Sequence, residues 1–356
     1  MAVYYELRNA DGKVWIMPAR HLRTAMELYQ PGGPKGKLLK QFFPLLHRIG
    51  IVRRVAGATV TAERLPGPLA ELLRCVLGVD EPEYSIFKGT PSVHQKTTIQ
   101  LFDRDRILAY CKTTQSEEIA GLFASESKVL SSLEALGVKG IPRCLYCGDT
   151  TDGLHTFVQS TEKTPHSRVL HGWTPLHDEF LATLHSRTRR RLPYEDTDYC
   201  HTMHELAGHL HWLPTTIDRS LVERMLAAIE ARWSGKEVEF SAYHADFTPW
   251  NMVEEQGRLF VFDWEYSRLT YPPGLDRYHF ATQTAIFERH LTAGQIIEEI
   301  DSIGDTGYVL YLADVVARFT MRERGRVSDS KAASFALWGE LLAHYLRIET
   351  HQHKRT

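Results

Sequence analysis

The chain has 356 residues, 43% of them hydrophobic, and its 42 basic and 44 acidic residues nearly cancel. This composition excludes a disordered tail, and the near-neutral charge excludes a global field that would draw the chain onto nucleic acid. An apolar run of the roughly 18 residues that a membrane span needs is missing, and five scattered cysteines do not form a disulfide framework, so we expect a cytoplasmic globular protein of two or three domains.

Residues 1–82 are expected to form an N-terminal extension made of a short hairpin and helices. The dipeptide Asp11-Gly12 lies between two segments rich in aromatic and β-branched residues, a pattern that predicts two paired strands. A helix is expected over residues 20–29. Apolar residues at helical spacing between Leu69 and Leu77, followed by Gly78, predict an amphipathic helix.

The segment 35–55 is both basic and apolar, and it contains Pro44. Two interpretations are open. Its lysines and arginines could meet anionic head groups while its leucines and phenylalanines dip into a membrane surface. The favoured interpretation is a proline-containing helix that packs on the main body of the protein, so membrane-surface contact is not the expected outcome.

Residues 83–162 are predicted to form a small β-rich lobe, and residues 163–356 a larger helical lobe. Three β-rich segments between residues 84 and 112 predict an antiparallel run. A helix is expected over residues 115–136, with Thr114 and Glu117 as a capping box. Short strands around 239–244 and 258–266 interrupt the helical part. The expected fold class is therefore α+β with two lobes.

Lys112 and Glu126 are candidates for a buried ion pair. Glu126 follows Leu122 by four residues, which places its carboxylate on or beside the apolar stripe of the predicted helix. A buried carboxylate needs a partner, and Lys112 ends the strand that leads into this helix. Such a pair would hold an ammonium group where a polyphosphate could bind, although a solvated Glu beside an edge Lys is the alternative.

Asp246, Asn251 and Asp263 are the polar residues that suit a hard cation. The first two lie in the loop-like stretch "HADFTPWN", and the third ends the apolar run "LFVF" twelve residues after Asn251. Asn and Asp oxygens can hold Mg²⁺ on phosphate groups, which leaves the other Asp to orient a hydroxyl and accept its proton.

The motifs "HADFTPWN" and "VFDWE" resemble the paired "HxDxxxxN" and "DxE" motifs of the aminoglycoside phosphotransferase and choline kinase family, which has a protein-kinase-like fold. The resemblance extends from about residue 84 to beyond residue 280. It implies that Asp246 is the catalytic base and that Asn251 and Asp263 bind Mg²⁺. It also implies that Lys112 contacts the phosphates of ATP with Glu126 as its partner.

The phosphate-covering loop of this family is glycine-rich, whereas "FKGTPSVHQKTT" offers only Gly89, so Ser92 or Lys96 would supplement it. The resemblance places "HTFVQSTE" where the lobes join, with Gln159 and Thr161 beside the adenine. It also implies a structural role for Asp276. Members of the resembling family more often have Gly at the position of Ala245.

The resemblance predicts a small-molecule kinase that uses ATP and Mg²⁺ to phosphorylate a hydroxyl group. Sugars or glycans, aminoglycosides and amino alcohols are all compatible acceptors, with a weak preference for a sugar or lipid-linked glycan. The alternative is a nucleotide-binding pseudokinase that acts as a regulatory module. The sequence does not decide the acceptor, the competence of the phosphate loop or the oligomeric state.

Overall fold

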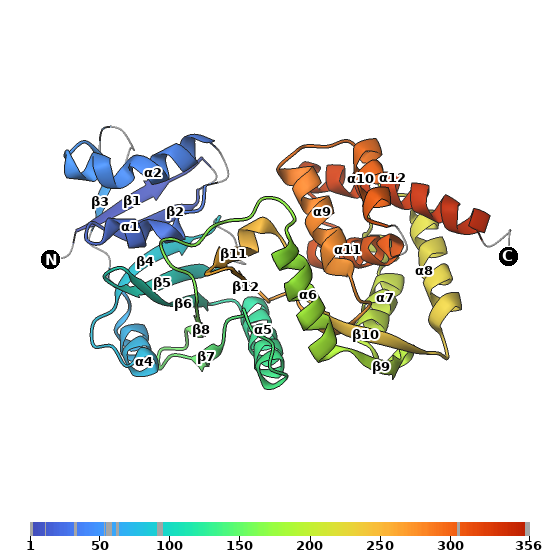
Figure 1. Cartoon of the computed structure of the whole chain (residues 1–356), viewed down its shortest axis with the longest axis horizontal. Coiled ribbons are helices and arrows are strands. Elements are labelled where there is room, and N and C mark those ends of the chain that lie inside the picture. The colour runs from blue at the N-terminus through green and yellow to red at the C-terminus, as the bar shows by residue number, and fades with distance from the viewer. Residues whose placement is uncertain are drawn as a thin grey trace. The chain divides into compact units, whose positions relative to one another are not determined.

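The computed structural model describes residues 3–10, 12–31, 34–52, 54, 59–61, 64–90, 95–304 and 307–352 (Figure 1). The chain divides into two compact units. The first unit comprises Met1–Val169 and Val253–Glu265, and the second comprises Leu170–Met252 and Tyr266–Thr356. None of the described helices is both long and apolar enough to cross a membrane.

The first unit is built on an eight-stranded sheet in the order β3-β1-β2-β4-β5-β6-β8-β7. Within the described residues, all neighbouring strands of this sheet pair in antiparallel fashion, from the β1–β2 hairpin to the β7–β8 pair. The elements of this unit are β1 Tyr4–Arg8, β2 Val14–Pro18, α1 Leu22–Ala25, α2 Pro34–Arg48, β3 Thr59–Thr61, α4 Gly67–Leu77, β4 Glu83–Lys88, β5 Thr97–Asp103, β6 Arg106–Thr114, α5 Glu117–Ala135, β7 Cys144–Asp149, β8 His155–Ser160, and the hairpin of β11 Met252–Glu255 with β12 Arg258–Val261.

The two faces of this sheet carry different side chains because strand residues alternate in direction. One face is apolar and packs against α4, as the cluster of Leu73 with Ile99 and Val158 shows. The other face includes Lys112, which pairs with Phe157 across β6 and β8. Phe157 stacks on Phe123 of α5, so this helix covers the second face at the β7–β8 end.

The opening section joins this sheet. The expected hairpin is present, with Tyr4 opposite Pro18, although Asp11 lies outside the described residues. Strand β2 pairs with β4, and the β11–β12 hairpin from Val253 onward belongs to the same unit. The extension and the β-rich lobe, expected to divide at residue 82, therefore form one unit joined by backbone hydrogen bonds. The second expected boundary, at residue 162, lies at Val169 in the structure.

The helices of the opening section differ in length from the expectation. Residues 20–29 form only α1 and the 3₁₀ turn Met26–Leu28, whereas α2 runs through Pro44. Phe43 of α2 is fully buried in a cluster with Trp15 and Met26. On the side of α2 that carries Phe43, the segment therefore packs on the main body of the protein, as the favoured interpretation expects.

Lys163 is a buried cation in the first unit. Its ammonium donates to the backbone oxygen of Glu27 at 3.0 Å and lies 3.8 Å from the carboxylate of the same residue. Burial lowers the pKa of Lys163 to about 8, against the opposing effect of Glu27. In the unfolded chain this amine returns to its ordinary pKa of 10.5.

We expect Lys163→Met to remove a pH dependence of stability. Between about pH 8 and pH 10.5 the unfolded chain binds a proton that the folded chain does not, so the wild-type free energy of unfolding gains at most about 3 kcal/mol from this residue as the pH rises. Denaturant titrations at several pH values should show this gain in the wild type and not in Lys163→Met. Lys40→Met, which removes another cation paired with Glu27, is the matched control and should retain most of the gain, because burial is the largest cause of the lowered pKa of Lys163 and Lys40 is only the third.

The second unit packs helices around a central helix, α11. Eleven of its sixteen residues are buried, which is typical of a helix surrounded on all sides. It contacts α7, α8, α9 and α12. The elements of this unit are α6 Pro175–Thr188, β9 Arg190–Pro193, α7 Asp198–Gly208, α8 Arg219–Trp233, β10 Glu237–Tyr243, β13 Arg268–Tyr271, α9 Leu275–Phe287, α10 Ala293–Ile303, α11 Tyr308–Glu323 and α12 Asp329–Gln352, with the strands in the order β13-β10-β9.

Candidate active site

The predicted pair of Lys112 and Glu126 is present in the first unit. Lys112 is 5% exposed near the end of β6, and Glu126 is fully buried on α5. The ammonium lies 2.8 Å from Oε2 and 3.1 Å from Oε1 of the carboxylate. Burial raises the pKa of Glu126 above its ordinary value, and the Lys112 ammonium opposes this effect. The alternative of a solvated Glu126 is therefore excluded.

The start of α5 differs in detail from the expectation. Ser116 is the N-cap residue, and its side chain makes no capping hydrogen bond. The hydroxyl of Thr114 instead accepts from the backbone N–H of Ser116 at 3.1 Å. The expected capping box of Thr114 with Glu117 does not form, because Thr114 still belongs to β6.

Asp263 completes a three-residue group around the Lys112 ammonium. Its Oδ1 lies 2.6 Å from Nζ, so the cation is shared between a buried carboxylate and one that is 29% exposed. The backbone N–H of the next residue, Trp264, donates to Glu126 at 3.1 Å, which ties the "VFDWE" motif to α5. Burial alone would lower the pKa of Lys112, and the carboxylates of Asp263 and Glu126 together raise it above its ordinary value.

Lys96 and Glu265 extend this group. The Lys96 ammonium lies 2.5 Å from Glu265 and 3.9 Å from Asp263. Together with Lys112 and Glu126, the group contains two ammonium and three carboxylate groups, so one negative charge is in excess. Glu265 was missed by sequence reasoning, although it is the third residue of the quoted "DWE".

The same three carboxylates form a possible cation site. Oxygen atoms of Glu126, Asp263 and Glu265 lie within 4.8 Å of one another. Carboxylate oxygens are the ligands that Mg²⁺ prefers, and the excess negative charge suits a cation. Glu126 is already engaged by Lys112 and Trp264, so Asp263 and Glu265 are the better candidates to hold a metal ion.

The residues expected to bind the nucleotide lie in or next to strands of the eight-stranded sheet. Gly89 follows β4, and its carbonyl accepts from the side chain of Gln95 at 2.6 Å, whereas Ser92 lies outside the described residues. Gln159 pairs with Tyr110 of β6 and therefore shares the face of the sheet that carries Lys112. Its buried Oε1 has no hydrogen-bond partner within the described part of the chain, so it can accept from a ligand.

Thr161 follows the end of β8, and its hydroxyl accepts from the backbone N–H of Lys163 at 3.0 Å. This hydrogen bond shapes the segment after the strand. The hydroxyl therefore has a structural role, and the assignment of Thr161 to the adenine stays a prediction.

Asp246 and Asn251 come together in the second unit. The Asn251 amide nitrogen donates to Oδ2 of Asp246 at 2.7 Å and to its backbone oxygen at 3.0 Å. Because an amide donates only through nitrogen, Oδ1 of Asn251 is the atom that would meet a cation. The Asp246 side chain is 30% exposed, so an acceptor molecule can reach it.

His279 is a further residue of this group that the sequence analysis missed. Its Nε2 lies 3.2 Å from Oδ1 of Asp246, and the imidazole is almost completely buried. Burial lowers the pKa of His279, so the ring is neutral and donates through Nε2 to the carboxylate. The sequence could have indicated His279 through its position three residues after Asp276, because residues at this spacing lie on the same side of a helix.

Asp276 has the structural role that the resemblance implied. Its carboxylate accepts from the backbone N–H groups of His244 at 3.0 Å and Ala245 at 3.2 Å. Ala245 has φ of 68°, a left-handed conformation that favours glycine and explains why Gly is more frequent here in the resembling family. These two hydrogen bonds, donated by the backbone to Asp276, hold the strained turn that directly precedes Asp246.

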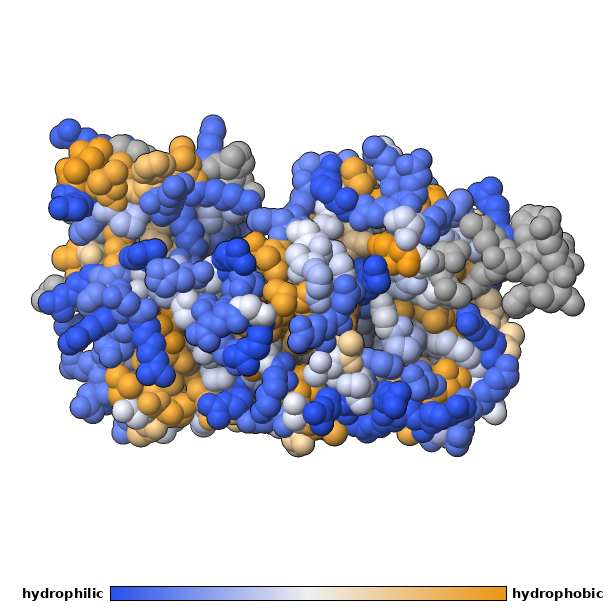
Figure 2. Space-filling view, viewed as in Figure 1, coloured by the Kyte–Doolittle hydropathy of each residue, from blue (hydrophilic) through white to orange (hydrophobic). Residues whose placement is uncertain are grey.

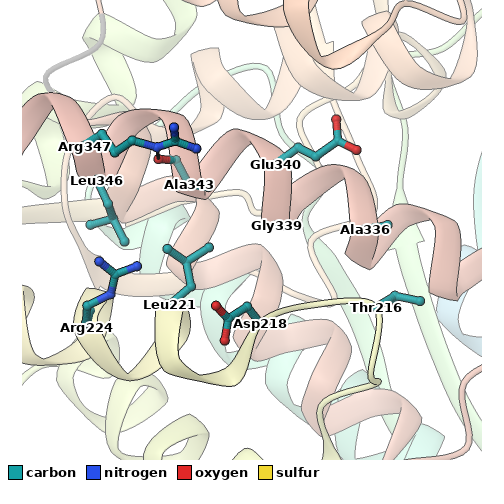
Figure 3. Close-up of a pocket in the computed structure, with 10 residues that line it drawn as sticks. All are labelled: Thr216, Asp218, Leu221, Arg224, Ala336, Gly339, Glu340, Ala343, Leu346 and Arg347. Atoms are coloured by element: carbon teal, nitrogen blue, oxygen red, sulfur yellow. Dashed lines mark hydrogen bonds between the residues drawn. The ribbon is translucent and has the colours of Figure 1, made fainter.

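A separate hollow of about 740 Å³ lies in the second unit beside α8 and α12 (Figure 3). Asp218 lines it, and its carboxylate caps α8 by accepting from the N–H of Ser220 at 2.9 Å. Arg224, Glu340 and Arg347 provide its other charged groups. None of its lining residues belongs to the Asp246 group, and we assign it no part in the site.

The antiparallel β-sheet unit and the helical unit define a protein-kinase-like fold, and this is the fold of the aminoglycoside phosphotransferases. A thermostable mutant of aminoglycoside phosphotransferase APH(4)-Ia, in ternary complex with ADP and hygromycin B, is 12% identical with a TM-score of 0.52, covering 78% of this chain and 98% of that one. Another structure of APH(4)-Ia is 14% identical with a TM-score of 0.52, covering 79% and 98%. No protein-family model and no curated protein matches the chain. The likeness confirms the predicted fold class.

Proposed function

We propose that this protein is a small-molecule kinase that transfers the γ-phosphoryl group of ATP to a hydroxyl group. The single observation that carries the proposal is the shared ammonium of Lys112, held between Glu126 and Asp263. A buried cation with fixed position suits the phosphates of a nucleotide, and a carboxylate beside it suits their metal ion. The fold, which it shares with known phosphotransferases, supports the same conclusion.

In this proposal, Lys112 binds the phosphate oxygens and Glu126 positions it. Asp263 and Asn251 hold Mg²⁺, with Glu265 beside Asp263 in the same acidic group. The metal ion would neutralise charge on the phosphates. Gly89 and Lys96 contribute to phosphate binding, and Gln159 and Thr161 lie beside the adenine.

Asp246 acts as the base. The acceptor hydroxyl donates its proton to the Asp246 carboxylate while its oxygen attacks the γ-phosphorus. The bond from that phosphorus to the β–γ bridging oxygen breaks, and ADP leaves with the electron pair. Asn251 and His279 orient the carboxylate through their hydrogen bonds to its two oxygens.

We expect Asp263→Ala to abolish the Mg²⁺ dependence of ATP binding. Without the carboxylate, the acidic group loses a ligand that is partly exposed to solvent and therefore accessible to a hydrated metal ion. Calorimetric titration of the wild type with ATP should show tighter binding with Mg²⁺ than without it. The variant should bind with the same low affinity in both conditions.

Asp149→Ala is the matched control, because it removes an exposed carboxylate of the same unit that pairs only with His155 in the contacts described. It should keep the Mg²⁺ dependence. If the wild type binds ATP equally well with and without Mg²⁺, the assignment of the acidic group to a metal is wrong.

The acceptor is then sought by incubating the protein with ATP and panels of sugars, glycans, aminoglycosides and amino alcohols. A gain of one phosphate, detected by mass spectrometry, identifies the acceptor. Tight ATP binding without transfer to any compound would instead favour the regulatory nucleotide-binding module.

A further inference from the structure

Helix α2 carries a row of apolar side chains on its solvent side. Leu38, Phe42 and Leu45 are 58%, 43% and 52% exposed, and Ile49, directly after the helix, is 57% exposed. Their spacing of four, three and four residues places them along one strip of the helix surface. Figure 2 shows hydrophobic surface gathered over α2. The other side of the helix is buried through Phe43, so the described residues leave this row, which we call the α2 stripe, exposed to solvent.

The residues that border the α2 stripe are basic. Residues 28–62 contain six lysines and arginines and no aspartate or glutamate. At 3.6 residues per turn, Lys35 lies about 60° to one side of Leu38, and Lys37 and Arg48 lie about 80–100° to the other side. All three are exposed. Long basic side chains on both edges of an apolar strip can keep their charges in water while the strip is buried.

We propose that α2 binds the surface of an anionic lipid bilayer. The α2 stripe would enter the boundary between head groups and acyl chains, and Lys35, Lys37 and Arg48 would meet the anionic head groups. Helix α2 lies parallel to the surface in this arrangement and does not cross it. The inference goes beyond the proposed phosphotransfer, since none of the residues assigned to that reaction belongs to α2.

A bilayer suits this surface better than a protein partner does. A stable protein interface covers roughly 800 Å² on each partner, which is more than one row of four partly exposed side chains offers. A membrane surface requires only a shallow apolar strip when several cations add their attraction. The absence of acidic residues from the segment matches the uniformly negative charge of anionic head groups.

The test is sedimentation of the full chain with vesicles. The wild type should bind vesicles of equal parts phosphatidylcholine and phosphatidylserine at low salt, and bind pure phosphatidylcholine far more weakly. Phe42→Glu combined with Leu45→Glu should reduce the partition coefficient at least about tenfold. Val169→Glu combined with Phe287→Glu makes the same charge change at exposed apolar positions outside α2 and should bind more strongly than the α2 variant.

A second variant separates the contribution of charge. Lys37→Gln combined with Arg48→Gln should weaken binding to anionic vesicles roughly tenfold, and added salt should weaken wild-type binding in the same direction. Circular dichroism verifies that each variant is folded. The proposal is wrong if the wild type does not bind anionic vesicles at low salt, or if the Phe42 and Leu45 variant binds as well as the wild type. A wild-type dimer that this variant converts to a monomer, without vesicle binding, would assign the stripe to contact between copies.

Discussion

Replacing Asp246 by Asn should lower the rate of phosphoryl transfer by about 10²–10⁴-fold, the usual contribution of a positioned general base. Asn has nearly the same shape but cannot accept the proton of the acceptor hydroxyl. It would also present an NH₂ group to one of the two donors, Asn251 or His279, that now face the carboxylate. The rate is measured in single turnovers with labelled ATP and saturating acceptor.

The affinity for ATP separates a chemical effect from misfolding. In the Asp246 variant it should stay close to the wild-type value, because the proposal assigns the nucleotide phosphates to Lys112. The same change from carboxylate to amide at Glu298, an exposed residue of α10, is the matched control and should leave the transfer rate unchanged. A variant at Asp246 that transfers phosphate at the wild-type rate would remove this residue from the mechanism.

Replacing Lys112 by Met should lower the free energy of unfolding by about 3–5 kcal/mol, the usual cost of removing one partner from a buried ion pair. Glu126 is fully buried and would lose its cation, and Asp263 would lose the closer of its two ammonium groups. The same variant should lose ATP binding. Denaturant unfolding and calorimetric titration measure the two effects. Lys139→Met, at an exposed position, is the control and should change stability by less than about 0.5 kcal/mol.

A double variant separates structure from binding at this position. Lys112→Met with Glu126→Leu replaces the buried pair by apolar side chains, an exchange that is often neutral for stability. It should recover part of the lost stability, although the N–H of Trp264 loses its acceptor. It should not recover ATP binding. Recovery of both would mean that Lys112 is only a structural partner of Glu126.

The local pattern of the sequence predicts those parts of the fold that depend on neighbours in the chain. Alternation between residues 84 and 112 indicates β4, β5 and β6, and the apolar stripe around Glu126 indicates α5. The pairing of β2 with β4 depends on contacts between distant segments, for which a single sequence has no local signal. For the same reason the division at residue 82 was expected and the continuous sheet was not.

The candidate site follows the same rule. Lys112 and Glu126 could be paired from the sequence because one strand leads directly into one helix. Asp263 is 151 positions away from Lys112, and only the motif resemblance placed both in one nucleotide-binding site. Glu265 and His279 were missed because their contacts depend on tertiary structure. In the sequence, attention went instead to the nearby Asp263 and Asp276, which already had assigned roles.

The pairing of β2 with β4 also determines how the sheet meets other chains. A strand with an unpaired edge presents a row of N–H and C=O groups to which any extended segment can bind. A chain that began at residue 83 would leave β4 as such an edge, with Ile86 and Phe87 in the exposed strand. The first 82 residues therefore cover the edge of β4 and leave the three-residue β3 as the edge strand on that side of the sheet, which offers fewer unpaired backbone groups to another chain.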